Sequence, residues 1–343
     1  MSADVSWWGR AVRAWIGTLR PDRTRGLARG TAGVRSPVAE GMTVSAGSGT
    51  SGSQALPVIG AAPGEANVSR VYDFLLGGKD SFAADRRLAA RIAQTQPLIV
   101  SGVRANRAFL RRAVAFLAER GIDQFLDIGS GLPTSENVHE IAGRVNPHAR
   151  TVYVDCDPIV LVHARALLAD TLRTIVVEGD VREPGKILDH PDVRTHLDFT
   201  RPVAVVMCAI LHFVGDHDDP AAIVAAFRGV MAPGSAIVIT HVVDDGDDPV
   251  SAATREAADI YAETTAPFVV RTREQVAAWF TGFQLAPPGL VDADLWRRAG
   301  NGKTTAPILA GVGLLPENPS AAPEPAAPSA STVRRHEATS EVR

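Results

Sequence analysis

The stretch Phe125-Leu-Asp-Ile-Gly-Ser-Gly131 decides the fold, because it runs from a short apolar segment directly into a glycine turn. A short apolar run of this kind predicts a buried strand, and the helix-like residues after it predict a strand–turn–helix unit. Two further strand-like stretches follow at regular spacing, 151–155 and 174–180, and each ends in an acidic residue. Three such units in series predict a parallel sheet with a ligand pocket at the carboxyl ends of its strands.

The residues at these strand ends suit the adenosine part of a cofactor. Glycine lacks a Cβ, so the Gly129/Gly131 turn lets backbone pass close to a ligand. Asp155, at the tip of the next strand, is placed to accept hydrogen bonds from ribose hydroxyls, and the third acid, Asp180, is placed to receive an adenine amino group. The candidate cofactor-binding residues are Asp127, Gly129, Gly131, Asp155, Asp180 and Val181.

The glycine turn favours a cofactor without phosphates. A dinucleotide fingerprint needs a third glycine, but the run Gly129-Ser-Gly-Leu-Pro-Thr134 has threonine at that place. Pro133 also removes a backbone N–H that a pyrophosphate would use. S-adenosylmethionine fits this turn, with its amino-acid tail lying over the glycines. An NAD-dependent oxidoreductase is the disfavoured alternative.

Several long motifs of the chain resemble a known family over residues 66–315. The family is that of the actinobacterial S-adenosylmethionine-dependent methyltransferases, formerly a domain of unknown function. The resemblance implies the class I methyltransferase fold and places Tyr72 and Asn106 in the substrate pocket. It is carried by the segments Arg70-Val-Tyr-Asp-Phe-Leu-Leu-Gly-Gly-Lys-Asp80, Arg104-Ala-Asn-Arg-Ala-Phe-Leu-Arg-Arg112, Phe125–Thr134, Asn137-Val-His-Glu140, Tyr153-Val-Asp-Cys-Asp-Pro158 and Leu211-His-Phe-Val214.

Composition limits the partners and the compartment. The chain has a net charge of −3, and its excess of acids lies in the central region, which argues against nucleic acid as a partner. Cys156 and Cys208 have no partner motif, which favours a reducing cytoplasm and a pair of core thiols. No apolar run is long enough for a membrane span. A small-molecule methyl acceptor is therefore the expected partner, and the oligomeric state stays open.

The two ends of the chain differ in composition from its centre. In residues 5–25, Trp8, Val12 and Trp15 share a helical stripe with arginines around it, so a weak membrane-surface contact is one reading. The alternative is that residues 1–41 are upstream sequence and that the protein starts at Met42. We expect residues 1–65 to be an extension and linker, residues 66–121 a helical cap, residues 122–315 the Rossmann-like core, and residues 316–343 a disordered tail.

Strand and helix patterns alternate through the core. Strand-like runs at 202–209 and 235–241 alternate with helix-period segments near 217–232 and 249–263. Two final apolar runs, near 282–285 and 306–314, have no full helix between them and predict an antiparallel hairpin. The predicted fold is α/β, a doubly wound and mostly parallel sheet with right-handed crossovers and an antiparallel C-terminal edge.

The sequence favours oxygen as the methylated atom. A hydroxyl acceptor needs a base, for which a histidine is the candidate, whereas a neutral nitrogen or a thiolate needs none. His212 follows the fourth strand and resembles the Leu-His segment of small-molecule O-methyltransferases, and His241 at the end of the fifth strand is the second candidate. Each also has a structural reading, as a hydrogen-bonded core histidine. The acidic loop groups near 216–219 and 244–248 read as solvated charge, so no metal site is expected. A regulator that binds the cofactor without catalysis has the same pocket and stays an alternative.

Overall fold

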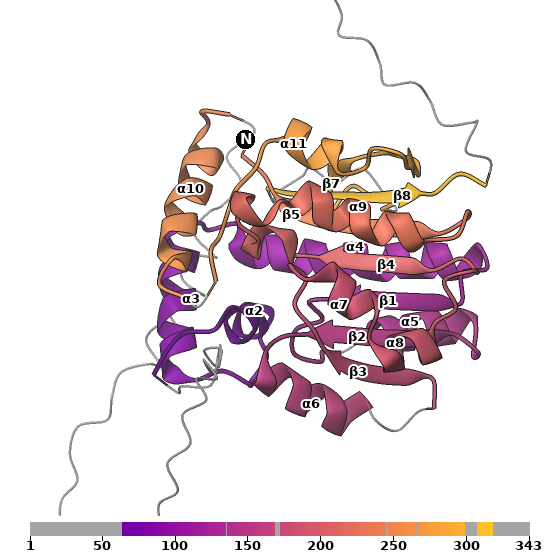
Figure 1. The fold of residues 1–343 in the computed structure, drawn as a ribbon. Helices are drawn as coiled ribbons and strands as arrows, with labels where there is room; N and C mark the ends of the chain where they lie inside the picture. The colour runs from indigo at the N-terminus through magenta and orange to yellow at the C-terminus, as the bar shows by residue number, and fades with distance from the viewer. Residues whose placement is uncertain are drawn as a thin grey trace, which may run out of the picture. The chain divides into compact units, whose positions relative to one another are not determined.

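The computed structural model describes residues 64–134, 136–168, 172–244, 246–264, 266–298 and 307–317. The predicted membrane-surface contact of residues 5–25, the linker up to residue 63 and the tail beyond residue 317 lie outside the described residues. The described chain forms an eight-stranded sheet with helices on both faces (Figure 1). The strands are β1 Gln124–Ile128, β2 Arg150–Asp155, β3 Thr174–Glu178, β4 Ala204–Cys208, β5 Ala236–Val242, β6 Gln284–Leu285, β7 Val291–Asp292 and β8 Ile308–Leu314.

The strand order is β3-β2-β1-β4-β5-β8-β6, with β7 also paired to β8. The first five strands pair in parallel, whereas β8 runs antiparallel to β5, β6 and β7. The predicted mostly parallel sheet with an antiparallel C-terminal edge is therefore confirmed. Sequence patterns gave β6 and β8 but missed the short β7, and they did not show that β8 inserts between β5 and β6.

Helices cover both faces of this sheet. The described α-helices are α2 Val68–Leu76, α3 Ala83–Thr95, α4 Ile99–Glu119, α5 Val138–Val145, α6 Pro158–Leu168, α7 Pro184–Leu188, α8 Pro191–His196, α9 Pro220–Val230, α10 Pro249–Tyr261 and α11 Arg273–Ala278. Two 3₁₀ turns, η1 Leu211–Phe213 and η2 Asp216–Asp218, follow β4. The helix starts follow the sequence signals: Asn67 caps α2, and Thr272 with Gln275 forms the capping box of α11.

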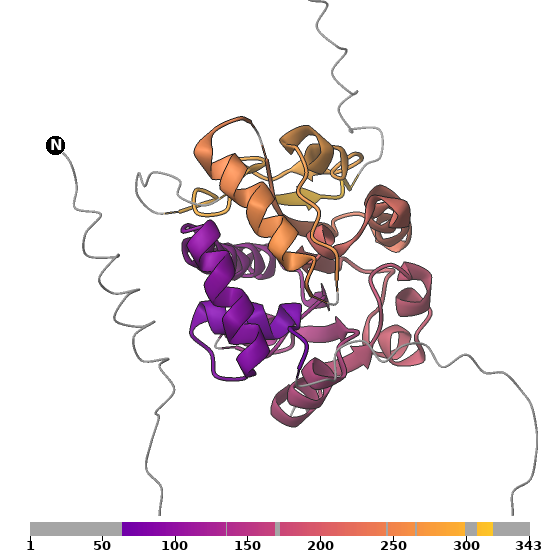
Figure 2. The same cartoon turned by 90° about the vertical axis from the view of Figure 1, so that its left-hand side faces the viewer.

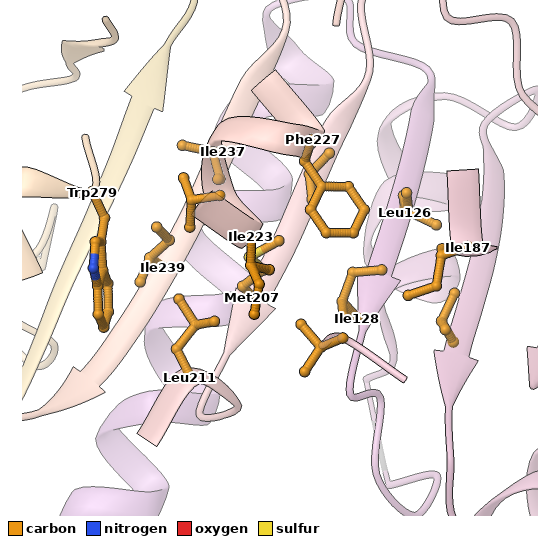
Figure 3. Close-up of a cluster of buried hydrophobic side chains, with 14 of the residues drawn as sticks. Leu126, Ile128, Ile187, Met207, Leu211, Ile223, Phe227, Ile237, Ile239 and Trp279 are labelled. Carbon is orange, nitrogen blue, oxygen red and sulfur yellow. The ribbon is translucent and has the colours of Figure 1, made fainter. Parts of the chain in front are cut away.

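Alternating strand residues supply two separate apolar layers. On β5, Ile237 and Ile239 face the layer packed by α7, α8, α9 and α11, and Val238 faces the opposite layer, packed by α4 and α5. Figure 3 shows the first layer, where Phe227 of α9 and Trp279 pack against side chains from β1, β4 and β5. This two-residue alternation is what a sheet buried on both faces requires.

A third cluster builds the cap over the carboxyl ends of the parallel strands. Apolar residues of α2, α3 and α10 pack together there, with Val71, Ile92 and Tyr261 buried. Figures 1 and 2 show these three helices on the side toward which the parallel strands point. We expected the helical cap to comprise residues 66–121, but the structure does not separate cap from core at residue 121. Helix α4 buries Phe109, Val114 and other residues against the sheet, so it belongs to the core layer as well.

Candidate functional site

One pocket collects the residues that end four neighbouring parallel strands. Its lining includes residues after β1 (129–134), β2 (155–157), β3 (180–182) and β4 (208–210), together with residues of α2 and α4. The strand order reverses between β1 and β4, and such a switch point is where open parallel sheets bind ligands. The sequence predictions Tyr72, Asn106, Asp127, Gly129, Gly131, Asp155, Asp180 and Val181 all line this pocket.

The glycine turn has the geometry that only glycine adopts without strain. Gly129 and Gly131 have φ angles of 69° and 65°. A Cβ on Gly129 would lie 2.6 Å from the side chain of Ile210, whereas a Cβ on Gly131 would meet nothing within 4 Å. The Ser130 hydroxyl between them is buried and has no hydrogen-bond partner among the described residues. An unmatched polar atom beside an open glycine surface fits a polar ligand tail lying over the turn.

Asp155 ties the second strand to this turn. Its carboxylate accepts hydrogen bonds from the backbone N–H of Gly131 and of Asp157, both at 2.9 Å. Burial raises the pKa of Asp155 to about 6, although these hydrogen bonds oppose the shift. A carboxylate offers about four lone-pair sites, so two remain for ribose hydroxyls.

Asp127 is the most perturbed carboxyl group of the pocket. Burial raises its pKa to about 7, against the opposing charge of Arg107 and with a small contribution from Asp155. Arg107 also lines the pocket, and its guanidinium donates to Thr134 Oγ1 at 2.6 Å and to the Glu136 carbonyl at 3.1 Å. This arrangement puts a cation beside the glycine turn, where the carboxylate of an amino-acid tail would lie.

Sequence reasoning missed Arg107 as a site residue. The only sequence signal for it was its place in the family-like segment 104–112. Asn67 and Asp157 were also missed, because they are local caps in sequence. In the structure, Asn67 Nδ2 donates to Asp157 Oδ2 at 2.5 Å and so links the start of α2 to the loop after β2.

Asp180 lies at the expected end of β3 but already has a partner. Arg182 donates to both of its carboxylate oxygens, and the backbone N–H of Arg182 donates at 2.9 Å. Burial raises the pKa of Asp180, but these hydrogen bonds outweigh it and the net shift is downward. Asp180 therefore stays ionised, with both of its carboxylate oxygens engaged by Arg182.

The two histidines predicted as catalytic lie outside the pocket lining. His241 is fully buried: its Nδ1 hydrogen-bonds to the Val242 carbonyl at 2.6 Å, and its Nε2 accepts from Arg271 at 3.1 Å. Both ring nitrogens are engaged, and burial lowers the pKa of His241 to about 3. Its structural reading as a hydrogen-bonded core histidine matches these contacts.

His212 packs in an aromatic cluster behind the pocket. Its ring centroid lies 4.5 Å from that of Phe213 and 4.8 Å from that of Phe268. Burial lowers its pKa well below the ordinary value, and the nearby His241 and Arg271 lower it further. The geometry thus gives the base role no support, because the ring faces apolar neighbours and not the pocket. Sequence spacing placed His212 after β4 correctly but could not show the direction of its side chain.

The acidic loop groups after β4 and β5 are held by arginines. Asp216 accepts from the buried Arg271 at 2.7 Å, and Asp244 pairs with Arg255 at 2.5 Å. In the described part of the chain, no group of three or more His, Cys, Asp or Glu side chains could hold a metal ion. The helices described there include none that is long and apolar enough to cross a membrane.

Comparisons with known proteins show the family of the chain. The model of a family described as S-adenosyl methyltransferase matches residues 62–316. A proposed methyltransferase from Thermobifida fusca is 43% identical, over 74% of this chain and 96% of that chain, with a TM-score of 0.69. A DUF574 family protein from Streptomyces avermitilis is 39% identical, over 74% and 98%, with a TM-score of 0.70. No curated protein matches. The chain therefore belongs to the S-adenosyl methyltransferase family, and the protein is an enzyme that uses S-adenosylmethionine as its cofactor.

Proposed function

We propose that the protein transfers a methyl group to a small molecule held beneath the cap. The observation that carries this proposal is that the pocket is lined by the cap as well as by the strand ends. Residues of α2 lie on one side of it, η1 and residues 266–267 on another, and the strand ends form its base. A macromolecular acceptor would need an open surface at the same place, whereas small-molecule sites are concave and mostly enclosed.

The adenosine half of the cofactor is assigned to the β2–β3 side of the pocket. Asp155 accepts from the ribose hydroxyls, and Asp180 with Val181 holds the adenine. The amino-acid tail lies over Gly129–Gly131, with Arg107 next to its carboxylate and Ser130 within its reach. When bound, the cofactor supplies an activated methyl group on a sulfonium. The chain's own task is to align the acceptor with that group and to exclude water.

The prediction of oxygen as the methylated atom depends on His212 as a base. Since that ring is outside the pocket lining, the observation that favoured oxygen is lost. The polar side chains of the lining instead include carboxylates, guanidiniums, one phenol, two amides and several hydroxyls. The function proposed for this site is accordingly methylation of a small molecule that needs no histidine base.

Binding of S-adenosylhomocysteine tests the cofactor site. We expect micromolar binding by calorimetry and a raised melting temperature by linkage, with no effect of NAD. Asp155→Asn should weaken binding roughly 30-fold or more, because an amide loses the charge-assisted acceptance from the ribose. Asp189→Asn, a change at a surface carboxylate 73% exposed, is the matched control. A thermal shift with NAD alone would contradict the proposal.

Transfer of a labelled methyl group separates an enzyme from a regulator. The protein is incubated with S-adenosylmethionine labelled in its methyl group and with a cell extract, which is then fractionated by size. Label in the small-molecule fraction is the expected result. Label in protein or nucleic acid would overturn the small-molecule assignment, and binding without any transfer would favour the regulator.

A further inference from the structure

A chain of four hydrogen bonds runs from the end of β4 to the cap. The backbone N–H of Ala209 donates to Thr240 Oγ1 at 2.8 Å, and the Thr240 hydroxyl donates to Asn106 Oδ1 at 2.7 Å. Asn106 Nδ2 then donates to the Tyr72 hydroxyl oxygen at 2.8 Å, and that hydroxyl lies 3.3 Å from the Val103 carbonyl. Asn106 and Thr240 are buried, and Tyr72 and Asn106 line the pocket.

The direction of this chain is set at its two ends. A backbone N–H can only donate and a backbone carbonyl can only accept. With Ala209 donating at one end and Val103 accepting at the other, both hydroxyl protons and one proton of the Asn106 amide have partners. The reverse orientation of the Asn106 amide would leave the Val103 bond unmade and the buried Thr240 hydroxyl without its acceptor, which costs free energy.

The consequence falls on the Tyr72 hydroxyl, the last side-chain group of the chain, which belongs to a residue of the pocket lining. Its proton is used by Val103 and one of its lone pairs by Asn106, so its second lone pair is left for a ligand. Burial raises the pKa of Tyr72 to about 12, and the phenol therefore stays neutral. In this state it can accept a hydrogen bond from a ligand N–H or O–H, but it has no proton for a carboxylate or phosphate.

The charge of the pocket also disfavours an anionic ligand. Five carboxylates line it, against two guanidiniums: Asp73, Asp127, Asp155, Asp157 and Asp180, with Arg107 and Arg182. Arg182 is paired with Asp180, and Arg107 donates to Thr134 beside the glycine turn, so the carboxylates still outnumber the guanidiniums. Asp73 is next to Tyr72 on α2 and is buried. An anionic acceptor would meet repulsion here, whereas an amine would not.

We propose that the methyl acceptor is an amine, and that Tyr72 orients it by accepting a hydrogen bond from its N–H. This inference rests on the proposed function. An amine that arrives as an ammonium first loses a proton to water. The lone pair of the neutral amine then forms the new carbon–nitrogen bond as the carbon–sulfur bond breaks, and sulfur keeps that electron pair. The product is first an ammonium, which the carboxylate-rich pocket tolerates and which later loses its proton to water. No base in the pocket is needed, in agreement with the positions of His212 and His241.

Two cofactor analogues test this assignment without the unknown substrate. S-adenosylhomocysteine has a neutral sulfur at the reacting centre, whereas sinefungin carries a primary amine there, an N–H donor. We expect calorimetry to show sinefungin binding roughly tenfold or more tightly than S-adenosylhomocysteine, the range for a hydrogen bond to a charged group. Tyr72→Phe should reduce this preference at least several-fold, while its affinity for S-adenosylhomocysteine stays close to that of the wild type.

Tyr261→Phe is the matched control, because Tyr261 is a buried tyrosine of α10 outside the pocket lining. It should keep both affinities. Equal affinity for the two analogues in the wild type, or a preference that survives Tyr72→Phe unchanged, would overturn the amine assignment. Binding of neither analogue would instead contradict the proposed cofactor site itself. Melting curves of both variants show whether an effect on binding comes from loss of fold.

Discussion

At the scale of single residues, the buried carboxyl groups of the site and of the cap have opposite environments. Asp127 and Asp155 are buried with raised pKa values, whereas the buried Asp85 accepts three hydrogen bonds, from Arg70 Nε at 2.8 Å and from two backbone N–H groups. Asp85 supports the fold of the cap through its ion pair. Burial of the Asp127 charge lowers the stability of the fold. A buried charge that lowers stability makes a residue a candidate for a functional role.

The pH dependence of Asp127→Asn follows from the raised pKa. Burial raises the pKa of Asp127 to about 7 in the folded protein, above its ordinary value in the unfolded chain, so folding favours its protonated form. Stability is therefore lost as the pH rises toward 7, and the loss is complete above it. We expect Asp127→Asn to raise the free energy of unfolding at pH 8 by on the order of 1–3 kcal/mol, with the gain shrinking as pH falls toward 5.

Chemical denaturation at pH 8 and pH 5 measures this effect. Asp192→Asn, at a carboxylate 75% exposed, is the control and should change stability little at either pH. The same Asp127→Asn variant should bind S-adenosylhomocysteine more weakly, which would show that stability is given up for function. A variant that is less stable than the wild type at pH 8 would refute the assignment of Asp127 as a destabilising charge.

At the scale of elements, α2 is joined to the sheet at its first turn. Asn67 caps the helix by accepting from the N–H groups of Ser69 and Arg70, and its amide nitrogen donates to Asp157. The Asn67 side chain thus caps α2 and also links it to the loop after β2, which lines the pocket. Asp157 in turn caps α6 by accepting from Ile159.

Substitutions at Asn67 separate these two roles. Asn67→Ser keeps a good helix cap, but its side chain is shorter than the Asn67 amide that reaches Asp157. Asn67→Asp keeps the cap while placing like charge against Asp157. We expect hydrogen exchange of residues 68–76 to rise roughly tenfold in the serine variant and more in the aspartate variant, with faster dissociation of S-adenosylhomocysteine. Exchange that stays at the wild-type rate in both variants would show that the Asn67–Asp157 bond does not hold the cap closed.

At the scale of the whole molecule, the sheet and its cap lie within residues 64–317 of the described chain, and the family match covers residues 62–316. A protein of residues 60–318 should therefore keep the thermal transition and the affinity for S-adenosylhomocysteine of the full chain. Calorimetry of the two proteins side by side measures both quantities. A melting temperature lowered by several degrees would show that residues 1–59 contribute to the fold.

The sequence by itself determined the elements and the cofactor end of the site. Strands β1 to β5 and the residues at their carboxyl ends follow from local information, because apolar runs, glycine turns and terminal acids occupy consecutive positions. Parallel pairing then brings Gly129, Asp155 and Asp180 to one edge whatever the details of packing. The antiparallel edge could also be predicted, since its two runs have no full helix between them.

The tertiary structure alone decided the cap side of the site. Asn67, Arg107 and Thr240 come from distant parts of the chain and meet the pocket only because α2 and α4 pack as they do. The directions of His212 and His241 depend likewise on Arg271 and Phe268, which lie 30 and 56 residues further on. Sequence spacing fixes where a residue stands along an element. The direction of its side chain is set by packing against elements that the local pattern does not contain.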